Sequence, residues 1–347
     1  MKEDAEGTPT RRLTMDGLAQ LAGVHKSTVS RALRPGTTFY RSETAQRIRA
    51  IAGSMDFQLD RNAASLRTRR TRTFGVLVPR LSDNLQAVFY EAVVRACEAH
   101  DYFALVAVTG DNPEGERHAG NVLLGRRVDG LILTSARING DYPHQLKNRD
   151  IPFVLAIRHA DGYASVVSDD AGGGRLATQH LIKLGHRRIG LVAGPDDASS
   201  SLGRRRGFYE AHQQAGLKID EKLVRESRFR WQDGYDIALE WLKSDDPPTA
   251  IFAVNDETAF GVVAAAQTLG LRLPQDLSVA GYGDIPSAAR PPLPLTTIRM
   301  DITRLADATV ELLYAHLEGK PRENRTIPVS LIVRESTAPP TQRITGT

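Results

Sequence analysis

Six side chains that can donate hydrogen bonds lie close together near the amino end, in the segment AGVHKSTVSRAL at residues 22–33. They are His25, Lys26, Ser27, Thr28, Ser30 and Arg31. Such groups on one face of a helix can read base edges and bind phosphates in a DNA major groove. The alternative is the solvated face of a small helical bundle, in which His25 can simply cap a helix.

Two short helices must position these donors. Thr14 is a plausible N-cap for the first helix, and Asp16 lies in its first turn, where the helix dipole favours a carboxylate. Gly23 permits the left-handed backbone of a tight turn, after which a second helix can begin at Ser27 and continue to Arg34. The residues predicted to pack between the helices have helix-turn-helix spacing: Ala19, Val24, Val29, Ala32 and Leu33.

A third helix is predicted in SETAQRIRAIAGSMDF, with Ser42 as its cap. Its apolar stripe is Ala45, Ile48, Ile51, Ala52 and Met55. The three helices give a helix-turn-helix domain at residues 13–59, small but able to form a core. Residues 1–12 are expected to be a disordered lead-in, and residues 60–73 a linker with a short helix that forms on DNA.

The basic charge is concentrated in this amino-terminal part. Residues 1–73 carry 14 Lys and Arg against 7 Asp and Glu, a net charge of +7, whereas the whole chain has a net charge of +4. The remainder is therefore −3. This asymmetry indicates a polyanion-binding head on a slightly acidic body, although charge alone also fits a solvated basic tail.

Several other classes of chemistry find no support. The single cysteine, Cys97, excludes an internal disulfide and a cysteine zinc cluster, and its spacing is that of a buried small hydrophobe. The glycine-rich AGGGR at residues 171–175 lacks the Walker lysine, so close packing is expected there. No catalytic motif appears, and we expect a protein that is not an enzyme and needs no cofactor or metal. No apolar run suits a signal peptide or a membrane span, so a cytoplasmic location is expected.

From residue 74 onward, short apolar runs alternate with helical stretches, as in FGVLVP, DGLILT, RIGLVAG and AIFAVN. This alternation is typical of parallel sheets covered by helices. About 270 residues exceed one comfortable core, so two α/β lobes are expected. Ligands in such sheets lie at the carboxyl ends of the strands, and two facing lobes can enclose a ligand by hinge motion.

Five motifs follow one another along the chain: TMDGLAQLAGVHKSTVSRAL, NAASLRT, RRRGFYEA, PTAIFAVNDETAFG and PLTTIRMD. With these motifs the chain resembles the LacI/GalR family of bacterial transcription regulators from Leu13 to Ser336. The resemblance implies an all-α helix-turn-helix head and a body of two periplasmic-binding-protein-like lobes with parallel sheets. Three crossings, near Ser168, Leu295 and Asn324, would divide residues 74–340. The expected N-lobe is 74–168 with 296–323, and the expected C-lobe is 169–295 with 324–340.

The resemblance also implies a homodimeric repressor that binds a pseudo-palindromic double-stranded operator. Besides the six donors, the implied DNA contacts are Thr14, Asn62 and Leu66. In the family a hinge-helix leucine enters the minor groove, and Leu66 stands at that position. The usual Pro-Asn before the hinge helix is Leu59-Asp60 here.

A small effector between the lobes, a sugar, sugar acid or sugar phosphate, is expected to control operator affinity. The expected contacts are Ser82, Ser135, Arg204, Phe229, Asn255, Asp256 and Asp284. Arg204 matches the family arginine that grips ligand hydroxyls or carboxylates. Gly283 stands where an aspartate is usual. Because losing that carboxylate while keeping Arg204, with Arg158 and Arg205 nearby, makes the pocket less hostile to anions, we hypothesise an anionic effector.

Two other classes stay open. A solute-binding protein could use the same two-lobed body, but the basic head and the missing signal peptide oppose it. An α/β enzyme is the second, and it lacks a catalytic constellation. The chain shows no leucine heptads after RESTAPP, which favours a dimer over a tetramer.

Overall fold

The computed structural model describes residues 13–33, 38–55, 57, 70–321 and 323–341, and it divides the chain into two compact units, residues 1–71 and 72–347. The predictions for residues 1–12, Arg34, Leu59-Asp60, Asn62 and Leu66 lie outside the described residues. We refer to the two units as the head and the body and describe each by itself.

The head is built from three helices around one apolar core, as predicted. They are α1 (Met15–Ala22), α2 (Lys26–Ala32) and α3 (Glu43–Ser54), with a short 3-10 helix η1 (Thr38–Arg41) before α3. Thr14 and Ser42 cap α1 and α3 through their side-chain oxygens. Buried core residues are Leu18, Ala19, Ala22, Val29, Ala32, Ala45, Ile48 and Ala52. This confirms the helix-turn-helix.

Two details of the head differ from the sequence prediction. The second helix begins at Lys26 and not at Ser27, because the Nδ1 atom of His25 accepts a hydrogen bond from the Ser27 amide at 3.2 Å and caps the helix. Met55 is wrong as a core residue. It is the residue after the last turn of α3, and it is 52% exposed. Gly23 has φ +63°, which confirms the left-handed turn.

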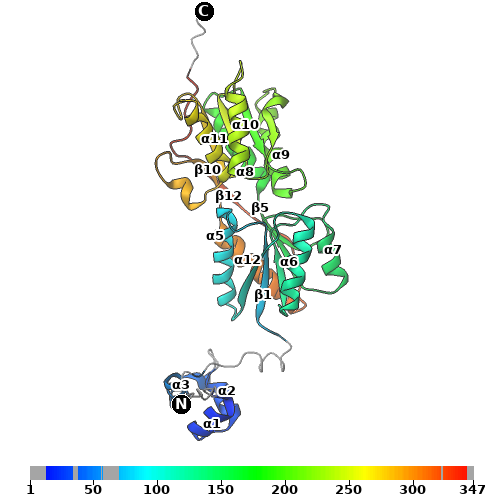
Figure 1. Cartoon of the computed structure of the whole chain (residues 1–347), viewed down its shortest axis with the longest axis vertical. Helices are drawn as coiled ribbons and strands as arrows, with labels where there is room; N and C mark the ends of the chain where they lie inside the picture. The colour runs from blue at the N-terminus through cyan, green and yellow to red at the C-terminus, as the bar shows by residue number, and fades with distance from the viewer. Residues whose placement is uncertain (1–12, 34–37, 56, 58–69, 322, 342–347) are drawn as a thin grey trace, which may run out of the picture. The chain divides into compact units, whose positions relative to one another are not determined.

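The first lobe of the body is a six-stranded sheet in the order β11-β5-β4-β3-β1-β2, with all adjacent pairs parallel. Its strands are β1 (Thr73–Val78), β2 (Phe103–Val108), β3 (Gly130–Leu133), β4 (Phe153–Ala156), β5 (Ser165–Ser168) and β11 (Arg325–Ile327). Helices α5 (Asn84–Glu98) and α12 (Ile302–Leu317) cover one face, and α6 (Pro113–Gly125) and α7 (Asp141–Asn148) cover the other (Figure 1). Alternate strand residues enter the two cores, with Val76 and Ile132 on one face and Leu77 and Leu131 on the other.

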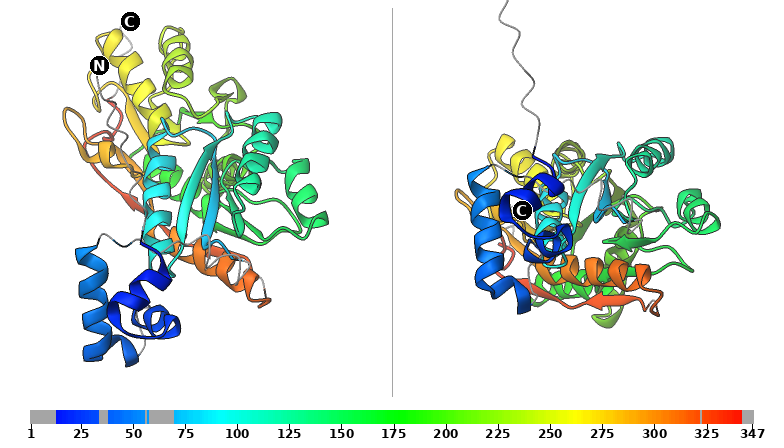
Figure 2. Two further views of the ribbon diagram at one scale, coloured as in Figure 1. Left: turned by 60° about the horizontal axis from the view of Figure 1, so that its bottom comes forward. Right: turned by 90° about the horizontal axis from the view of Figure 1, so that it is seen from below.

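The second lobe repeats the pattern with the order β12-β10-β9-β8-β6-β7, and only its β10–β12 pair is antiparallel among the described strands. Its strands are β6 (Ile189–Ala193), β7 (Val224–Glu226), β8 (Ala250–Ala253), β9 (Ser278–Gly283), β10 (Thr296–Met300) and β12 (Val329–Ile332). Its helices are α8 (Asp170–Lys183), α9 (Ser199–Gln214), α10 (Trp231–Leu242) and α11 (Asp256–Thr268), with short 3-10 helices η2 (Glu221–Leu223) and η3 (Pro286–Ala289). Figure 2 shows the two lobes from other directions.

The chain crosses between the lobes three times, but two crossings lie later than predicted. The first follows Ser168, as expected. The second follows Met300, because β10 pairs with β9 in the second sheet, so residues 296–300 do not belong to the first lobe. The third lies between Ile327 and Val329, because β11 pairs with β5 in the first sheet. The sequence prediction assigned β10 and β11 to the wrong lobes, because the apolar pattern of a strand does not indicate which sheet the strand joins.

The glycine-rich start of α8 serves packing against α9. A Cβ at Gly174 would lie 2.1 Å from the backbone oxygen of Arg204, and one at Gly207 would lie 2.1 Å from the backbone oxygen of Ala171. Glycines therefore let the two helix backbones meet directly. The close packing predicted for AGGGR is thus found against the neighbouring helix α9, and Gly173 also packs against Tyr282 of the sheet.

Candidate functional site

The donors on α2 form one exposed end and face of the helix. His25, Lys26, Ser27 and Arg31 are exposed, whereas Thr28 and Ser30 are half-buried. The buried side of the helix carries Val29 and Ala32, so the polar groups cannot turn inward without losing this packing. The outer face of α2 therefore has the composition expected of a surface that contacts a polyanion.

Local contacts order the first turn of α2. Lys26 forms an ion pair of 2.8 Å with Asp16 of α1, with both side chains more than half exposed. The imidazole of His25 lies 2.8 Å from the Ser27 hydroxyl. Thr14 accepts the Gly17 amide at 3.2 Å, so its hydroxyl is used as a cap. Thr14 and His25, both predicted to contact DNA, thus also cap α1 and α2.

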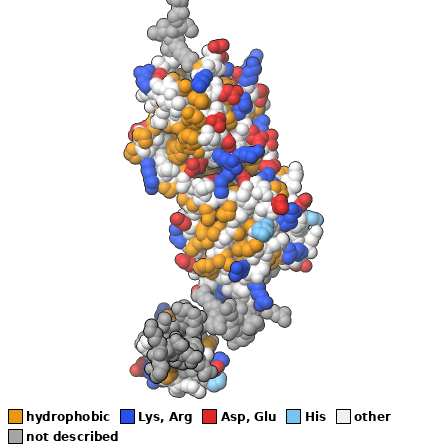
Figure 3. Space-filling view, in the orientation of Figure 1, with side chains coloured by type: hydrophobic (Ala, Val, Ile, Leu, Met, Phe, Trp, Pro, Cys, Tyr) orange, Lys and Arg blue, Asp and Glu red, His pale blue; other side chains and the backbone are white. Residues whose placement is uncertain are grey.

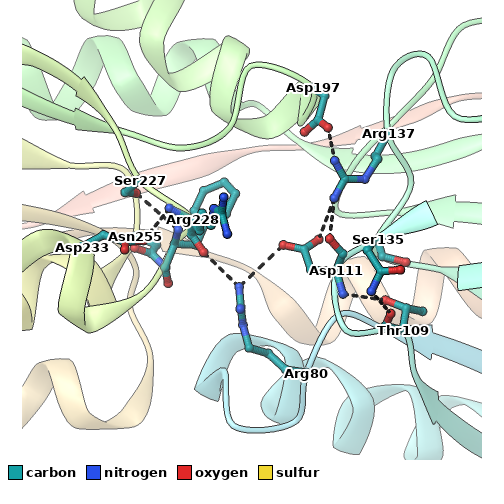
Figure 4. Close-up of polar contacts among 12 residues, drawn as sticks. Arg80, Thr109, Asp111, Ser135, Arg137, Asp197, Ser227, Arg228, Asp233 and Asn255 are labelled. Carbon is teal, nitrogen blue, oxygen red and sulfur yellow. Dashed lines mark hydrogen bonds and ion pairs between the residues drawn. The ribbon is translucent and has the colours of Figure 1, made fainter. Parts of the chain in front are cut away.

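The carboxyl ends of strands from both lobes meet at one junction in the body. In each sheet the strand order reverses beside the first strand of the lobe, β1 in one and β6 in the other. Open α/β sheets bind ligands at such switch points, outside the carboxyl ends of the strands. Figure 4 shows polar side chains from both lobes around this junction, and Lys and Arg side chains gather where the lobes meet in Figure 3. We call this junction the interlobe cleft.

The first lobe contributes three arginines to the interlobe cleft. Arg80 follows β1, Arg137 follows β3 and Arg158 follows β4. All three approach one carboxylate, Asp111 after β2, with nitrogen–oxygen distances of 3.7 Å, 4.0 Å and 3.4 Å respectively. We call these three residues the arginine cluster.

Members of the arginine cluster also reach the second lobe. Arg137 forms an ion pair with Asp197, which follows β6, and the Ile138 amide donates to the Asp197 backbone oxygen at 3.0 Å. Arg80 donates to the backbone oxygen of Arg228 at 3.0 Å (Figure 4). These contacts connect the two lobes across the cleft.

The second lobe presents Phe229 and Asn255. Phe229 is 8% exposed, has φ +59°, and its ring centre lies 5.6 Å from the Arg158 guanidinium carbon. The amide of Asn255 donates to the Phe229 backbone oxygen at 3.1 Å and accepts the Thr258 amide at 3.1 Å. Asn255 is thus the N-cap of α11, and its bond to the Phe229 backbone oxygen supports the unusual backbone conformation of Phe229. The structure brings both predicted residues to the cleft.

Arg204 lies in a different environment from the one predicted. It is 2% exposed, and its Nε atom donates to Asp170 at 2.8 Å while its Nη1 atom donates to the Val254 backbone oxygen at 2.6 Å. Its guanidinium also lies over the Tyr282 ring, 3.7 Å from the ring centre. These contacts join α8, α9 and the sheet of the second lobe. The role of Arg204 as an effector contact stays a prediction.

The remaining predicted effector contacts are also used within the protein. Both carboxylate oxygens of Asp284 accept hydrogen bonds of 2.6 Å, one from Arg299 and one from Arg334. The Ser135 hydroxyl donates to Glu116 at 2.9 Å, and burial raises the pKa of the Glu116 carboxyl. Ser82 is exposed in the turn after β1.

Asp256 is buried at the start of α11 and accepts hydrogen bonds from the Thr297 hydroxyl at 2.5 Å and from the Ile285 amide at 3.0 Å. Gly283 has φ +133°, and a Cβ there would lie 3.3 Å from a carboxylate oxygen of Asp256. Burial raises the pKa of Asp256 to about 6. Gly283, the position at which the family resemblance predicts an aspartate, thus packs beside the buried carboxyl group of Asp256.

This raised pKa predicts a pH dependence of stability. Between about pH 4 and pH 6 the native carboxyl group binds more protons than the unfolded one, so the free energy of unfolding falls as pH rises through this range. From about pH 5 to pH 7 the protein should lose about 1 kcal/mol more than the Asp256→Asn variant loses. Urea unfolding at both pH values measures this difference, with Asp245→Asn, at an exposed loop position, as the matched control. Equal pH dependence in wild type and Asp256→Asn contradicts the prediction.

A cavity of about 760 Å³ lies elsewhere, at the amino ends of β4, β5 and β11. Lys147, Tyr163, His316 and Asn324 are among its lining residues. This is the opposite end of the strands from the interlobe cleft, and none of the predicted effector residues lines it. Because ligands of open α/β sheets bind at the carboxyl ends, we place the candidate site in the interlobe cleft.

Sequence reasoning missed Arg80, Asp111, Arg137 and Asp197. The sequence analysis predicted Ser82 after the first apolar run as an effector contact and did not include Arg80, two residues earlier. These residues could have been found by looking for a charged residue within a few positions of the end of each apolar run. Which of these charges meet depends on contacts across 26 to 60 residues of sequence, as in Arg137 with Asp111 and Asp197.

The chain is similar to known regulators over nearly its whole length. Residues 178–337 match the model of a periplasmic binding protein-like domain. The HTH-type transcriptional repressor PurR of Pasteurella multocida (strain Pm70) is 31% identical over 328 residues, which cover 93% of this chain and 98% of that protein. No helix among the described residues is long and apolar enough to cross a membrane.

Solved structures agree with this similarity. The lac repressor dimer bound to operator and the anti-inducer ONPF superposes with a TM-score of 0.81 at 25% identity, covering 94% of this chain and all of that chain. The complex of the transcriptional regulator CelR with cellobiose gives a TM-score of 0.72 at 27% identity, with the same coverage. A helix-turn-helix head, a two-lobed body and these relatives together show that the chain belongs to the LacI/GalR family of transcriptional regulators.

Proposed function

We propose that this protein is a sequence-specific DNA-binding repressor that acts as a homodimer and whose operator affinity is controlled by a small effector in the interlobe cleft. The observation that carries the proposal is α2, a helix with its apolar side in the core of the head and its donors exposed. A helix of this kind can enter a major groove, and two copies can read a pseudo-palindromic site. The lac repressor relative was solved as a dimer bound to operator.

A carbohydrate-like effector is the proposed ligand class. Phe229 offers an aromatic face, and Asn255 retains donor and acceptor capacity beyond the two bonds that it makes, so the cleft can pack against a sugar ring and bind its hydroxyls. The relative CelR was solved in complex with cellobiose. The proposed effector contacts are Phe229, Asn255 and the arginine cluster. Arg204, which is buried in the second lobe, is an additional proposed contact.

Contacts between the lobes provide a route for control. Arg137 and Asp197, Arg80 and the Arg228 backbone, and Asn84 and Glu257 join the two lobes around the cleft. A ligand that changes these contacts changes the relative stability of lobe arrangements, and only such a difference can alter operator affinity.

The test is selection of genomic DNA fragments by the full chain, followed by gel shift of the retained fragments in a salt series. We expect preferential retention of a few fragments, with affinity that falls by roughly a thousandfold between about 50 and 200 mM salt, because bound phosphates release counterions. Retention of no fragment above bulk DNA contradicts the proposed repressor. That outcome would favour a solute-binding protein, or an enzyme if turnover of a sugar is detected.

A further inference from the structure

The arginine cluster contains more hydrogen-bond donors than its partners use. Asp111 is the carboxylate that all three members share, and none of them lies within 3.3 Å of its carboxylate oxygens. Arg80 uses Nη2 for the Arg228 backbone oxygen, and Arg137 uses its two terminal nitrogens for Asp197 and the Asp111 backbone oxygen. Each guanidinium therefore keeps N–H groups available at the interlobe cleft.

Arg158 is the member whose burial is hardest to explain by packing alone. It is 5% exposed, and its Nη1 atom has only two contacts, both at 3.4 Å, with Asp111 and with the Ser135 backbone oxygen. Its Nε and Nη2 atoms have no hydrogen-bond partner among the described residues. Burial lowers the pKa of this guanidinium, which means that the surroundings do not fully compensate its charge. A buried charge with unused donors is costly unless a partner arrives.

The other carboxylates near the arginine cluster, those of Asp197 and Glu116, do not form an ion pair with Arg158. Asp197 belongs to the second lobe, where it forms an ion pair with Arg137, and its charge also acts on Arg158 from a longer distance. Glu116 lies behind Ser135 and is bonded to its hydroxyl, and burial raises the pKa of Glu116, which favours its neutral form. The Phe229 ring centre lies 5.6 Å from the Arg158 guanidinium carbon, so the aromatic ring and the guanidinium are neighbours at the cleft. A guanidinium beside an aromatic ring suits a ligand that has an anionic group and an apolar or ring-shaped body.

We propose that the effector of this protein is an anion, a carboxylate or a phosphate ester on a small carbohydrate-like body, bound through the arginine cluster. This inference rests on the proposed function and specifies its ligand. It also changes the basis of the sequence hypothesis. The anion was expected at Arg204, with Arg158 and Arg205 nearby. Arg204 is bonded to Asp170 and Arg205 to Asp196, so only Arg158 of these three belongs to the arginine cluster. The charged group of the effector instead adds the missing partner of Arg158 and neutralises the cluster.

Inorganic phosphate is the probe, because it carries the charge without any recognition of a sugar body. The full chain is titrated with phosphate at constant ionic strength, with chloride as the balancing anion, and its thermal midpoint is recorded. We expect a saturable rise in the midpoint for the wild type. The Arg158→Gln and Arg80→Gln variants should require at least about tenfold more phosphate for the same rise, since each loses charge-assisted hydrogen bonds.

Arg225→Gln is the matched control, since Arg225 forms an exposed ion pair with Glu240 on the second lobe and should respond like the wild type. Two outcomes overturn the inference. One is a wild-type midpoint with no saturable response, and the other is an equal response in wild type, Arg158→Gln and Arg80→Gln, which marks general salt stabilisation.

A second titration distinguishes the two sources of negative charge. D-glucuronate and D-glucose 6-phosphate are compared with neutral D-glucose in the same assay and in Arg158→Gln. Stabilisation by either anion, lost in the variant, supports the inference and names the group, whereas stabilisation by D-glucose alone overturns it. Operator binding is measured separately by gel shift without any sugar. Failure of the anion titrations with intact operator binding therefore leaves the proposed repressor standing.

Discussion

Replacing Arg204 with alanine is expected to lower the free energy of unfolding of the body by about 3–5 kcal/mol, because it leaves a buried carboxylate without its partner. Asp170 lies in the first turn of α8 and is bonded to Arg204 at 2.8 Å, with side-chain exposures of 10% and 3%. Removal of the guanidinium also leaves the Val254 backbone oxygen without this donor and the Tyr282 ring without its cation. All three losses act on the second lobe.

Urea unfolding of the full chain without any effector measures this loss. Arg205→Ala is the matched control, because Arg205 is the next residue on α9. It is half-buried and pairs with the exposed Asp196, so a change below about 1 kcal/mol is expected. The double variant Arg204→Met with Asp170→Leu should recover most of the lost stability, since it removes both charges together. A loss below about 1 kcal/mol in Arg204→Ala would show that the ion pair contributes little.

The same variant separates two roles for Arg204. A residue that only grips the effector leaves the stability of the ligand-free protein unchanged when it is removed. A residue that joins α8, α9 and the sheet lowers stability in the absence of ligand. The contacts of Arg204 favour the second role, in which it stabilises the second lobe. Binding of the effector by Arg204 would be an additional role.

The head shows how far local sequence information reaches. The caps Thr14 and Ser42, the left-handed Gly23 and the core positions Val29 and Ala32 were all predictable, because each depends on neighbours within a few residues. Even the alternative for His25, a capping role, is what the structure shows. Met55 was not predictable in this way, since helical periodicity does not say where the helix ends.

The interlobe cleft shows where local information stops. Sequence periodicity predicted the parallel strands and the edge of the sheets at which we propose that the effector binds. It did not predict that the Asn255 side chain accepts a hydrogen bond from the Thr258 amide and donates one to the Phe229 backbone oxygen, or that two arginines donate to Asp284. These partners come from other strands and loops, so their pairing follows only from the assembled sheets. The same holds for the crossing strands β10 and β11.

The charged groups at the interlobe cleft are divided between the two lobes. The arginine cluster lies wholly on the first lobe, and its interlobe partners are a carboxylate and a backbone oxygen of the second. An anion bound by the cluster competes with Asp197 for Arg137. The proposed anionic effector would exchange an interlobe ion pair for a ligand contact, and such a differential interaction shifts a conformational equilibrium.

Replacing Arg31 with alanine should weaken specific operator binding by about 1–3 kcal/mol at each half-site, the usual contribution of a bidentate contact between arginine and a base. Because a dimer carries the change twice, the expected loss is roughly thirtyfold to twenty-thousandfold in affinity. Arg31 is exposed on α2, one position after the half-buried Ser30 and beside the buried Ala32. Its removal therefore leaves the core of the head intact.

Gel shift of a selected genomic fragment measures this loss, and the Arg31→Lys variant shows its cause. Lysine keeps the charge but lacks the planar fork, so Arg31→Lys should keep binding to bulk DNA while losing preference for the selected fragment. Arg225→Ala removes the same charge from the body and should bind the fragment like the wild type. Equal affinity of Arg31→Ala and wild type for the fragment would contradict the assignment of α2 as the helix that reads the operator. Because the body is unchanged in these variants, their response to phosphate should match that of the wild type, which separates the reading of DNA from the binding of the effector.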